Sequence, residues 1–190
     1  PIYVKGGKVN DLIEDDRITA ISLTGSSEVG AKVAGIAGEN IKKCVLELGG
    51  SDPFIVLPDA DIELSCKIGV DARFLNGGQS CISAKRFIVH EDVYDEFVGK
   101  YVEVLNSKKV GDPFDETTDI GPLANRSIYE TVFEQVQSSV DMGAEILYGE
   151  LKYSDEGSLL SPLVLGNVDL KMPVFSEEVF GPVASVIKYR

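Results

Sequence analysis

Short apolar runs alternate with helical patterns at the start of the chain. Residues 17–23 form an apolar run that predicts a buried strand, and apolar positions with helical spacing over 28–37 predict a helix after it. Two more apolar runs, at 44–48 and 53–57, predict strands on either side of the break Gly49-Gly50-Ser51. This order of strand, helix and strand predicts a parallel sheet with a right-handed crossover.

The rest of the chain continues the alternation. Helical spacing of apolar residues predicts helices over 59–75, 92–105 and 128–142, and a loop is expected over 111–125. The predicted strands in this part are residues 86–90, 145–151, 163–168 and 182–189. The pattern as a whole is typical of an α/β protein.

Composition narrows the function classes. The 190 residues include 18 basic and 31 acidic side chains, so the net charge is −13, and 44% of the residues are apolar. This apolar content is too high for a disordered acidic tail, and the negative charge disfavours binding to nucleic acid or to anionic membranes. No apolar run approaches the length of a membrane span. The chain begins at Pro1 without Met and is already β-rich over residues 1–7, so we expect a piece of a longer protein.

Cysteine and histidine usage limits the chemistry further. The three cysteines, Cys44, Cys66 and Cys81, are odd in number, lie far apart and lack metal-type spacing. We therefore expect neither a disulfide framework nor a structural zinc site, and a reducing cytoplasm is the expected location. His90 is the only histidine, so a Cys–His pair or a Ser–His–Asp triad would have to use it.

Cys81 is the first candidate for chemistry. It follows Asn76-Gly77-Gly78-Gln79-Ser80, a loop in which glycines allow the backbone to approach a ligand closely. An exposed thiolate near backbone N–H groups is a good nucleophile. The alternative is a buried, inert cysteine, which is what the apolar surroundings of Cys44 and Cys66 predict for those two.

Glu47 is the second candidate. It lies inside the apolar run 44–48, just before two glycines. A carboxylate that lies at the end of a strand and has few polar neighbours is suited to act as a general base. The alternative is an ordinary solvent-facing residue of that strand.

Two turns are candidate ligand contacts. Thr24-Gly25-Ser26-Ser27 joins a predicted strand to a predicted helix, and free N–H groups at a helix N-terminus bind phosphate. The spacing is not that of the GxGxxG fingerprint, so a plain helix cap is the alternative. In Glu177-Glu178-Val179-Phe180-Gly181-Pro182 a carboxylate could accept hydrogen bonds from sugar hydroxyls, or the segment could be only a turn.

Taken together, these segments resemble the signatures of the NAD(P)-dependent aldehyde dehydrogenase superfamily. The segments are Leu46-Glu47-Leu48-Gly49-Gly50, Gly78-Gln79-Ser80-Cys81 and Glu178-Val179-Phe180-Gly181-Pro182, and their order and separations match that superfamily. Leu23-Thr24-Gly25-Ser26 resembles the turn beside the cofactor pyrophosphate. The resemblance covers essentially the whole chain. Within the superfamily, residues 42–57 are most similar to bacterial succinate-semialdehyde dehydrogenases.

The resemblance implies oxidation of an aldehyde, with succinic semialdehyde as the expected substrate, to a carboxylic acid with NAD or NADP. Cys81 is implied to attack the aldehyde carbon and, after hydride transfer, to carry a thioester, and Glu47 is implied to activate the water that hydrolyses it. Glu47 argues against the CoA-acylating branch, which lacks that glutamate. The Cys81 N–H is implied to supply half of the oxyanion site, and the other half is an asparagine that the family places before Pro1.

The resemblance also implies cofactor contacts. Ser26, with Gly25 beside it, is implied to contact the pyrophosphate, and Glu178 to accept hydrogen bonds from the nicotinamide ribose. Phe180 is implied to line the nicotinamide pocket, and Leu48-Gly49 to lie beside the ring. These residues place the cofactor, which supplies the hydride chemistry.

Arg73 is a candidate substrate contact. A semialdehyde carries a carboxylate at its far end, and Arg73, on the helix before the Cys81 loop, is suited to a bidentate contact with it. The alternative is a surface arginine, or one paired with Asp71 or with groups near Glu47. Ser80 and Ile82 flank Cys81, so the redox switch that a second neighbouring cysteine permits in some relatives is not expected.

The resemblance implies two domains. Residues 1–48 are implied to be the C-terminal part of a Rossmann-type cofactor-binding domain, and 49–190 a catalytic domain truncated at its C-terminal end. The parent is expected to be a homo-oligomer that acts on a small-molecule aldehyde, and the 190-residue piece alone to have little or no activity. The alternatives are a non-catalytic soluble α/β fragment and a cofactor-independent thiol esterase that uses Cys81 and Glu47.

Overall fold

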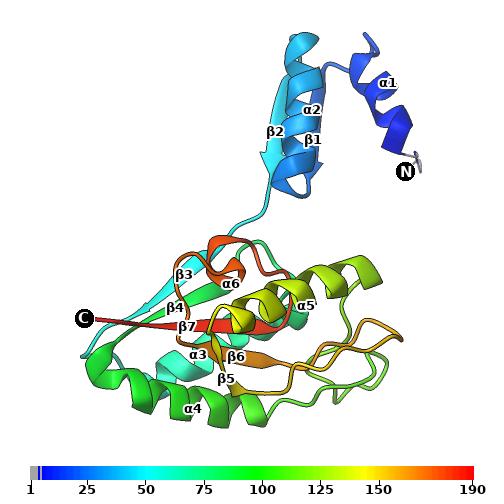
Figure 1. Cartoon of the computed structure of the whole chain (residues 1–190). Helices are drawn as coiled ribbons and strands as arrows, with labels where there is room; N and C mark the ends of the chain where they lie inside the picture. Colours follow the sequence, from blue (N-terminus) through cyan, green and yellow to red (C-terminus); the bar gives the residue numbers. More distant parts are fainter. Residues whose placement is uncertain (1–3, 5) are drawn as a thin grey trace. The chain divides into compact units, whose positions relative to one another are not determined.

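The computed structural model describes residue 4 and residues 6–190. They fall into two compact units, Pro1–Gly49 and Gly50–Arg190, and each is described here by itself (Figure 1). The β-rich start expected for residues 1–7 lies mostly outside the described residues, and Gly6–Lys8 form a short 3-10 helix. The assignment of the two units to cofactor binding and to catalysis stays a prediction.

The first unit is a strand–helix–strand motif with one additional helix. Its elements are α1 (Val9–Glu14), β1 (Ala20–Thr24), α2 (Ser27–Glu39) and β2 (Lys43–Glu47). β1 and β2 pair in parallel, from Ala20 opposite Lys43 to Thr24 opposite Glu47, as the sequence predicted. The sequence analysis missed α1, which is only six residues long and buries Ile13 against Val33 and Ala37 of α2.

The second unit contains a five-stranded mixed sheet. Its elements are β3 (Asp52–Val56), α3 (Ile62–Phe74), the 3-10 turn η2 (Leu75–Gly78), β4 (Ala84–His90), η3 (Glu91–Val93), α4 (Tyr94–Asn106), α5 (Arg126–Asp141), β5 (Glu145–Tyr148), β6 (Leu163–Gly166), α6 (Pro173–Ser176) and β7 (Val183–Tyr189). The strand order is β3-β4-β7-β6-β5. All neighbours are parallel except β5, which runs antiparallel to β6 because no helix lies between these two strands in the sequence.

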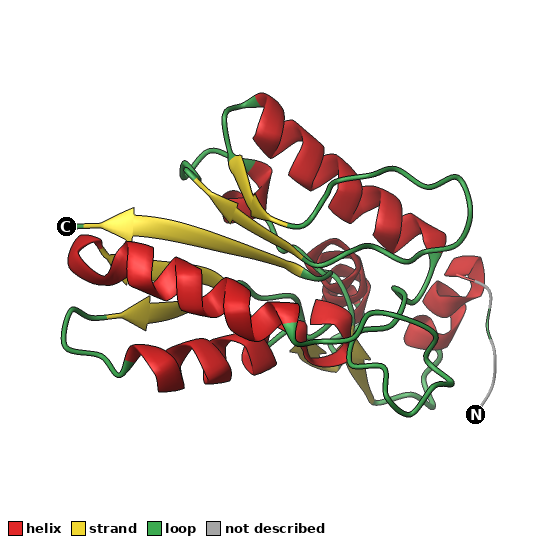
Figure 2. Cartoon of the chain, turned by 90° about the horizontal axis from the view of Figure 1, so that it is seen from below, coloured by secondary structure: helices red, strands yellow, loops and turns green. Residues whose placement is uncertain are grey.

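Helices cover both faces of this sheet. α3 and α4 lie on one face, and α5 and α6 on the other (Figures 1 and 2). Successive side chains of β6 point to opposite faces of the sheet. Val164 packs in the core formed with α3 and α4, whereas Leu163 and Leu165 pack in the core formed with α5. A strand buried on both faces needs apolar side chains at consecutive positions, which explains the continuous apolar runs in the sequence.

Side chains cap the helices that precede and follow the candidate site residues. Asp61 accepts a hydrogen bond from the Leu64 N–H at 3.0 Å and so caps α3. Asn125 does the same for α5 through the Ile128 N–H, also at 3.0 Å. The predicted helix over 59–75 and the predicted helix over 128–142 are therefore confirmed with small shifts at their ends. The short α6 was not predicted, because a single turn carries no periodicity.

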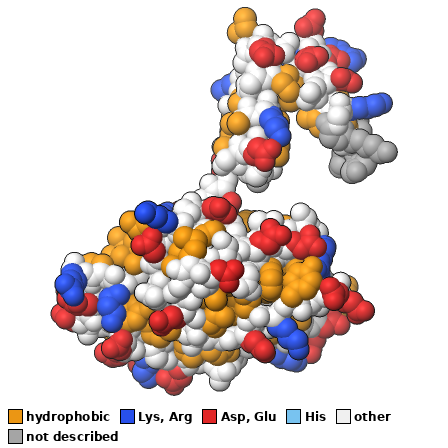
Figure 3. All heavy atoms as spheres, viewed as in Figure 1, with side chains coloured by type: hydrophobic (Ala, Val, Ile, Leu, Met, Phe, Trp, Pro, Cys, Tyr) orange, Lys and Arg blue, Asp and Glu red, His pale blue; other side chains and the backbone are white. Residues whose placement is uncertain are grey.

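The surface is mixed in character. Figure 3 shows apolar side chains interspersed with acidic and basic ones on the face in view. Within the part that the structure describes, no helix combines the length and the apolar character needed to cross a bilayer. Among the same residues, no group of three or more His, Cys, Asp and Glu side chains is arranged to hold a metal ion.

Candidate active site

Cys81 lies on an exposed loop between α3 and β4. The chain leaves α3 through three consecutive residues with positive φ, Asn76 at 54°, Gly77 at 63° and Gly78 at 75°. This left-handed turn redirects the backbone away from the helix axis and places Cys81 at the surface. Cys66, by contrast, is fully buried in the core, and burial raises its pKa to about 12. The structure therefore confirms the buried position predicted for Cys66 and places Cys81 at the surface. The prediction of a buried Cys44 is wrong, because Cys44 is half-buried.

Two glycines bring the Cys81 loop against the Glu178 segment. A Cβ atom at Gly78 would collide with the carbonyl group of Gly181, so the two backbones are in direct contact. Gly181 in turn packs against Val132 of α5, where a Cβ would approach to 3.0 Å. The glycines of these two motifs therefore serve close backbone packing, and they fix residues 78–83 beside residues 178–183.

Arg73 is wrong as a substrate contact. Its side chain is 0% exposed, and its guanidinium uses all five N–H donors inside the protein. The acceptors are Val183 O at 2.5 Å, Ser83 Oγ at 2.7 Å, Val179 O at 2.9 Å, Gly78 O at 3.3 Å and Gly181 O. No donor is left for a carboxylate of a substrate.

Two of the alternatives considered for Arg73, a surface arginine and a pair with Asp71, are also wrong. It is not a surface arginine, and Asp71 pairs with Lys108 at 2.9 Å instead. Burial lowers the pKa of Arg73 to about 10, which still leaves the guanidinium charged at neutral pH. Arg73 therefore connects the Cys81 loop to the Glu178 segment as a buried structural cation.

Lys85 links the same two segments through a charge. Its side chain is 2% exposed, and Nζ donates to the carbonyl oxygens of Ser80 at 2.8 Å and Cys81 at 3.1 Å. Glu178 Oε1 lies 3.5 Å from the same Nζ and accepts a hydrogen bond from the Gly50 N–H at 3.1 Å. Glu178 is therefore held beside the carbonyl groups of the Cys81 loop.

Gln135 of α5 holds the acidic segment from the other side. Its Nε2 donates to Glu177 Oε2 at 2.9 Å and to Glu178 O at 3.2 Å. Sequence reasoning missed both Lys85 and Gln135. A signal was present, because each is a polar residue in a pattern that is otherwise apolar, Lys85 at the start of a buried strand and Gln135 on the apolar side of a helix.

Phe180 is half-buried in the same segment, between buried Val179 and buried Gly181. This placement leaves part of the ring accessible. Its role as a wall of the nicotinamide pocket stays a prediction.

The first unit carries the other predicted site residues at the carboxyl ends of β1 and β2. Ser26 caps α2 by accepting a hydrogen bond from the Val29 N–H at 3.3 Å, and the Gly25 N–H donates to Glu47 O at 3.0 Å. Glu47 is exposed at the end of a strand whose residues alternate between exposed and half-buried. Open α/β sheets bind ligands at the carboxyl ends of their parallel strands.

Leu48 and Gly49 follow directly after β2. The Leu48 side chain packs on Gly30 of α2, where a Cβ would lie 2.5 Å from Leu48 Cδ2. Gly49 is exposed. Within the first unit the structure thus brings Gly25 and Glu47 together, and within the second it brings the Cys81 loop and Glu178 together.

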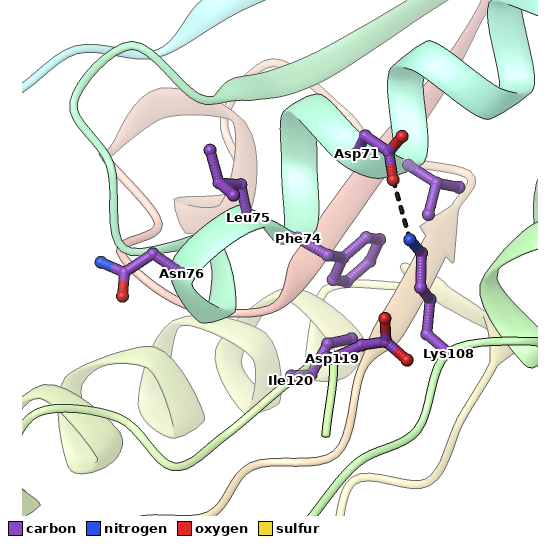
Figure 4. A pocket seen from close by; sticks show the side chains of 8 residues that line it. Asp71, Phe74, Leu75, Asn76, Lys108, Asp119 and Ile120 are labelled. Carbon is purple, nitrogen blue, oxygen red and sulfur yellow. Dashed lines mark hydrogen bonds and ion pairs between the residues drawn. The ribbon is translucent and has the colours of Figure 1, made fainter. Parts of the chain in front are cut away.

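A pocket of about 370 Å³ lies where α3 ends and the Cys81 loop begins (Figure 4). Leu75 and Asn76 border it at this end, and the Asp71–Lys108 ion pair borders it at the other. Leu75 is 73% exposed there. The pocket combines apolar and charged walls, and it adjoins the turn that positions Cys81.

Comparison with known proteins identifies the family. The sequence profile of the Aldehyde dehydrogenase family matches residues 3–190. The chain belongs to this family. A succinate-semialdehyde dehydrogenase [NADP(+)] of Mycobacterium avium is 48% identical over 187 residues, which are 98% of this chain and 40% of that protein. The resemblance inferred from the sequence motifs is thereby confirmed.

Solved structures of aldehyde dehydrogenases share the fold. Aldehyde dehydrogenase C of Pseudomonas syringae, crystallised with NAD⁺ and octanal, matches with a TM-score of 0.90 and 34% identity over 95% of this chain and 38% of that one. Lactaldehyde dehydrogenase of Escherichia coli matches with a TM-score of 0.90 and 36% identity over 95% of this chain and 38% of that one. The predicted α/β class is confirmed, and the chain spans about 40% of the length of the relatives it matches.

Proposed function

We propose that this chain supplies the nucleophile, the hydrolytic base and part of the cofactor site of an enzyme that oxidises an aldehyde to a carboxylic acid with NAD or NADP. The observation that carries the proposal is the exposed Cys81 on a loop joined by Arg73 and Lys85 to the segment of Glu178. Family membership supports the reaction class. The exposure of Cys81 and its link to the Glu178 segment support the choice of residues.

The chemistry assigned to Cys81 is nucleophilic. Its thiolate forms a C–S bond to the aldehyde carbon, and the carbonyl electrons move to oxygen, which the Cys81 N–H helps to stabilise. NAD or NADP, when bound, would supply the acceptor for the hydride on this carbon. The product on the enzyme is then a thioester of Cys81.

Glu47 is assigned to hydrolysis. Its carboxylate takes a proton from a water molecule whose oxygen attacks the thioester carbon. The C–S bond breaks, the carboxylic acid leaves, and Cys81 returns to the thiolate. Its position at the open carboxyl end of β2 leaves it accessible to water.

Each unit, taken by itself, has residues that suit one part of a dinucleotide. Ser26 and Gly25 lie at the N-terminus of the 13-residue α2, where free N–H groups favour a phosphate, and a Cβ at Gly25 would meet only Leu23 at 3.9 Å. In the second unit Glu178 is anchored through Oε1 and is 28% exposed, which suits a carboxylate that accepts from a sugar hydroxyl. NADP or NAD as the cofactor follows from the names of the relatives.

Succinic semialdehyde is the proposed substrate. Its support is the 48% identity to a succinate-semialdehyde dehydrogenase, since Arg73 is no longer available to bind its carboxylate. The proposal includes a cytoplasmic homo-oligomer as the whole protein, with neither nucleic acid nor membrane as a partner. The 190-residue chain alone is proposed to have little or no activity, because it spans about 40% of its relatives.

The decisive experiment replaces Cys81 in the whole protein. NADH or NADPH formation from succinic semialdehyde should be lost in Cys81→Ser and kept in the control Cys44→Ser. Turnover of Cys81→Ser at the unsubstituted rate would refute the assignment.

The second candidate function, a cofactor-independent thiol esterase, is favoured by the exposure of Cys81 alone. Hydrolysis of a nitrophenyl ester without NAD, lost in Cys81→Ser, would support it.

A further inference from the structure

Lys85 is a buried cation with three oxygen atoms around its ammonium group. An ammonium group has three N–H donors, and Nζ of Lys85 faces three acceptors: Ser80 O, Cys81 O and Glu178 Oε1. The side chain comes from the second position of β4, directly after the Cys81 loop. Its ammonium therefore lies between two backbone carbonyls of the loop and the carboxylate of a segment almost a hundred residues away in sequence.

The charge of Lys85 depends on Glu178. Burial lowers the pKa of Lys85 from its ordinary value, and the negative charge of Glu178 is the largest influence that raises it again. Arg73 and Asp52 are the other charged groups that act on Lys85, the first lowering and the second raising its pKa. A buried ammonium is tolerated only when it is paired, so Lys85 and Glu178 keep each other in place.

Glu178 is anchored at one oxygen. Among the described residues, its side chain has two polar contacts, an ion pair with Lys85 Nζ and a hydrogen bond from the Gly50 N–H. Both are made by Oε1. The side chain is nevertheless 28% exposed. This arrangement fixes the carboxylate on its protein side and leaves Oε2 as the oxygen for an outside donor.

We propose that Lys85 is a positioning residue that sets the orientation of Glu178 toward the cofactor ribose and ties it to the backbone of the Cys81 loop. This inference rests on the proposed function, because it takes Glu178 as the ribose contact. It differs from the role of Arg73, which joins the same segments through four backbone carbonyls and the Ser83 hydroxyl. Lys85 is the cation that acts on the ligand-binding group itself.

A double-mutant cycle on the whole protein tests this inference. The dissociation constant of NADH or NADPH is measured by fluorescence titration without aldehyde for the unsubstituted protein, Lys85→Met, Glu178→Gln and the double variant. Each single variant should weaken binding by roughly tenfold or more, because Glu178 loses either its charge or the cation that orients it. The double variant should bind no more weakly than Glu178→Gln, because Lys85 acts through Glu178.

Controls separate positioning from general stability. Lys100→Met removes a lysine that is 48% exposed and pairs with Glu103 on α4, and it should leave the dissociation constant unchanged. Lys85→Arg keeps the charge and should recover part of the lost affinity. If Lys85→Met does not fold, Lys85→Gln removes the charge while keeping a donor, and the cycle is measured with that variant.

The outcomes distinguish the inference from the proposed function. Unchanged affinity in the folded Lys85 variant, or losses that multiply in the double variant, would overturn the positioning role. If the unsubstituted whole protein binds neither NADH nor NADPH, the proposed function itself fails.

Discussion

Gly78 and Gly181 are in backbone contact, with no space for a side chain between them. Gly78 has φ of 75°, a conformation that costs an L-residue about 1–2 kcal/mol. The contact joins the loop of the candidate nucleophile to the segment of the candidate ribose ligand. Glycine is therefore required at position 78 for two reasons: its backbone angle disfavours other residues, and there is no space for a Cβ.

Gly78→Ala should destabilise the protein and reduce its activity. Backbone strain and overpacking against Gly181 add up, and overpacking alone costs about 1–3 kcal/mol. The matched control is Gly157→Ala, at φ of 71° with nothing within 4 Å of the added Cβ, which isolates the strain. Thermal unfolding of both variants measures the difference, and equal midpoints would show that the contact has no energetic role.

Replacement of Arg73 should reduce stability and leave substrate discrimination intact. Arg73→Lys keeps the charge but has only three donors for five acceptors, and each buried acceptor without a partner costs about 1–3 kcal/mol. Arg17→Lys, on a side chain that is 88% exposed, is the control and should have little effect on the unfolding midpoint.

The substrate test on Arg73→Lys uses kcat/KM for succinic semialdehyde and for an uncharged aldehyde of similar length. In the folded Arg73→Lys protein, the ratio of these two kcat/KM values should equal the ratio measured for the unsubstituted protein. A selective loss for succinic semialdehyde would restore Arg73 as a carboxylate contact and contradict its buried position.

The secondary structure followed from the apolar pattern because most elements are long enough to show a period. β1, β2 and the strands of the second sheet lie within a few residues of the predicted ranges. The antiparallel pairing of β5 with β6 was not predicted, and it depends on the absence of a helix between these two strands. Pairing direction is a tertiary property that a local run of apolar residues does not encode.

The candidate site likewise contains residues that local sequence motifs predict and residues that only the folded structure reveals. Cys81, Glu47 and Glu178 were predicted because they lie in recognisable motifs. Lys85 was missed because its importance depends on a partner far away in sequence. Arg73 shows the limit most clearly. A charged residue on a helix is usually exposed, and only the fold reveals that five acceptors from two segments surround it.

Native labelling should distinguish the two cysteines of the second unit. Iodoacetamide should modify exposed Cys81 in the native protein at pH 8 and leave Cys66 unmodified, because Cys66 is buried and its pKa is raised to about 12. In denaturant both should react. Peptide mass spectrometry assigns the sites, and rapid native labelling of Cys66 would show that the core around it opens readily.

The raised pKa of Cys66 also predicts a pH dependence of stability. The thiol ionises in the unfolded chain near its ordinary value of 9.0 but stays protonated in the native state up to about 12. The native state then binds more protons, so this contribution is fully present below pH 9 and is lost as the pH rises toward 12. The free energy of unfolding is measured at pH 8 and at pH 10 for Cys66→Ala and for the unsubstituted protein. It should fall less between these two pH values in Cys66→Ala.

Glu47→Gln should separate the two halves of the proposed reaction. Attack by Cys81 and hydride transfer do not need the Glu47 carboxylate, whereas activation of water for thioester hydrolysis does. Rapid mixing with succinic semialdehyde and excess cofactor should therefore give a burst of about one NADH or NADPH per active site, followed by a steady rate reduced by roughly 100-fold or more, the usual scale of general base catalysis.

The control for this burst is Glu39→Gln, at the exposed C-terminal end of α2, which should turn over at the unsubstituted rate. A thioester on Cys81 should be trapped in Glu47→Gln and detected as added mass on the Cys81 peptide. Full turnover of Glu47→Gln would leave Glu47 as the ordinary solvent-facing residue that its alternating strand also allows, and another group would have to activate the water.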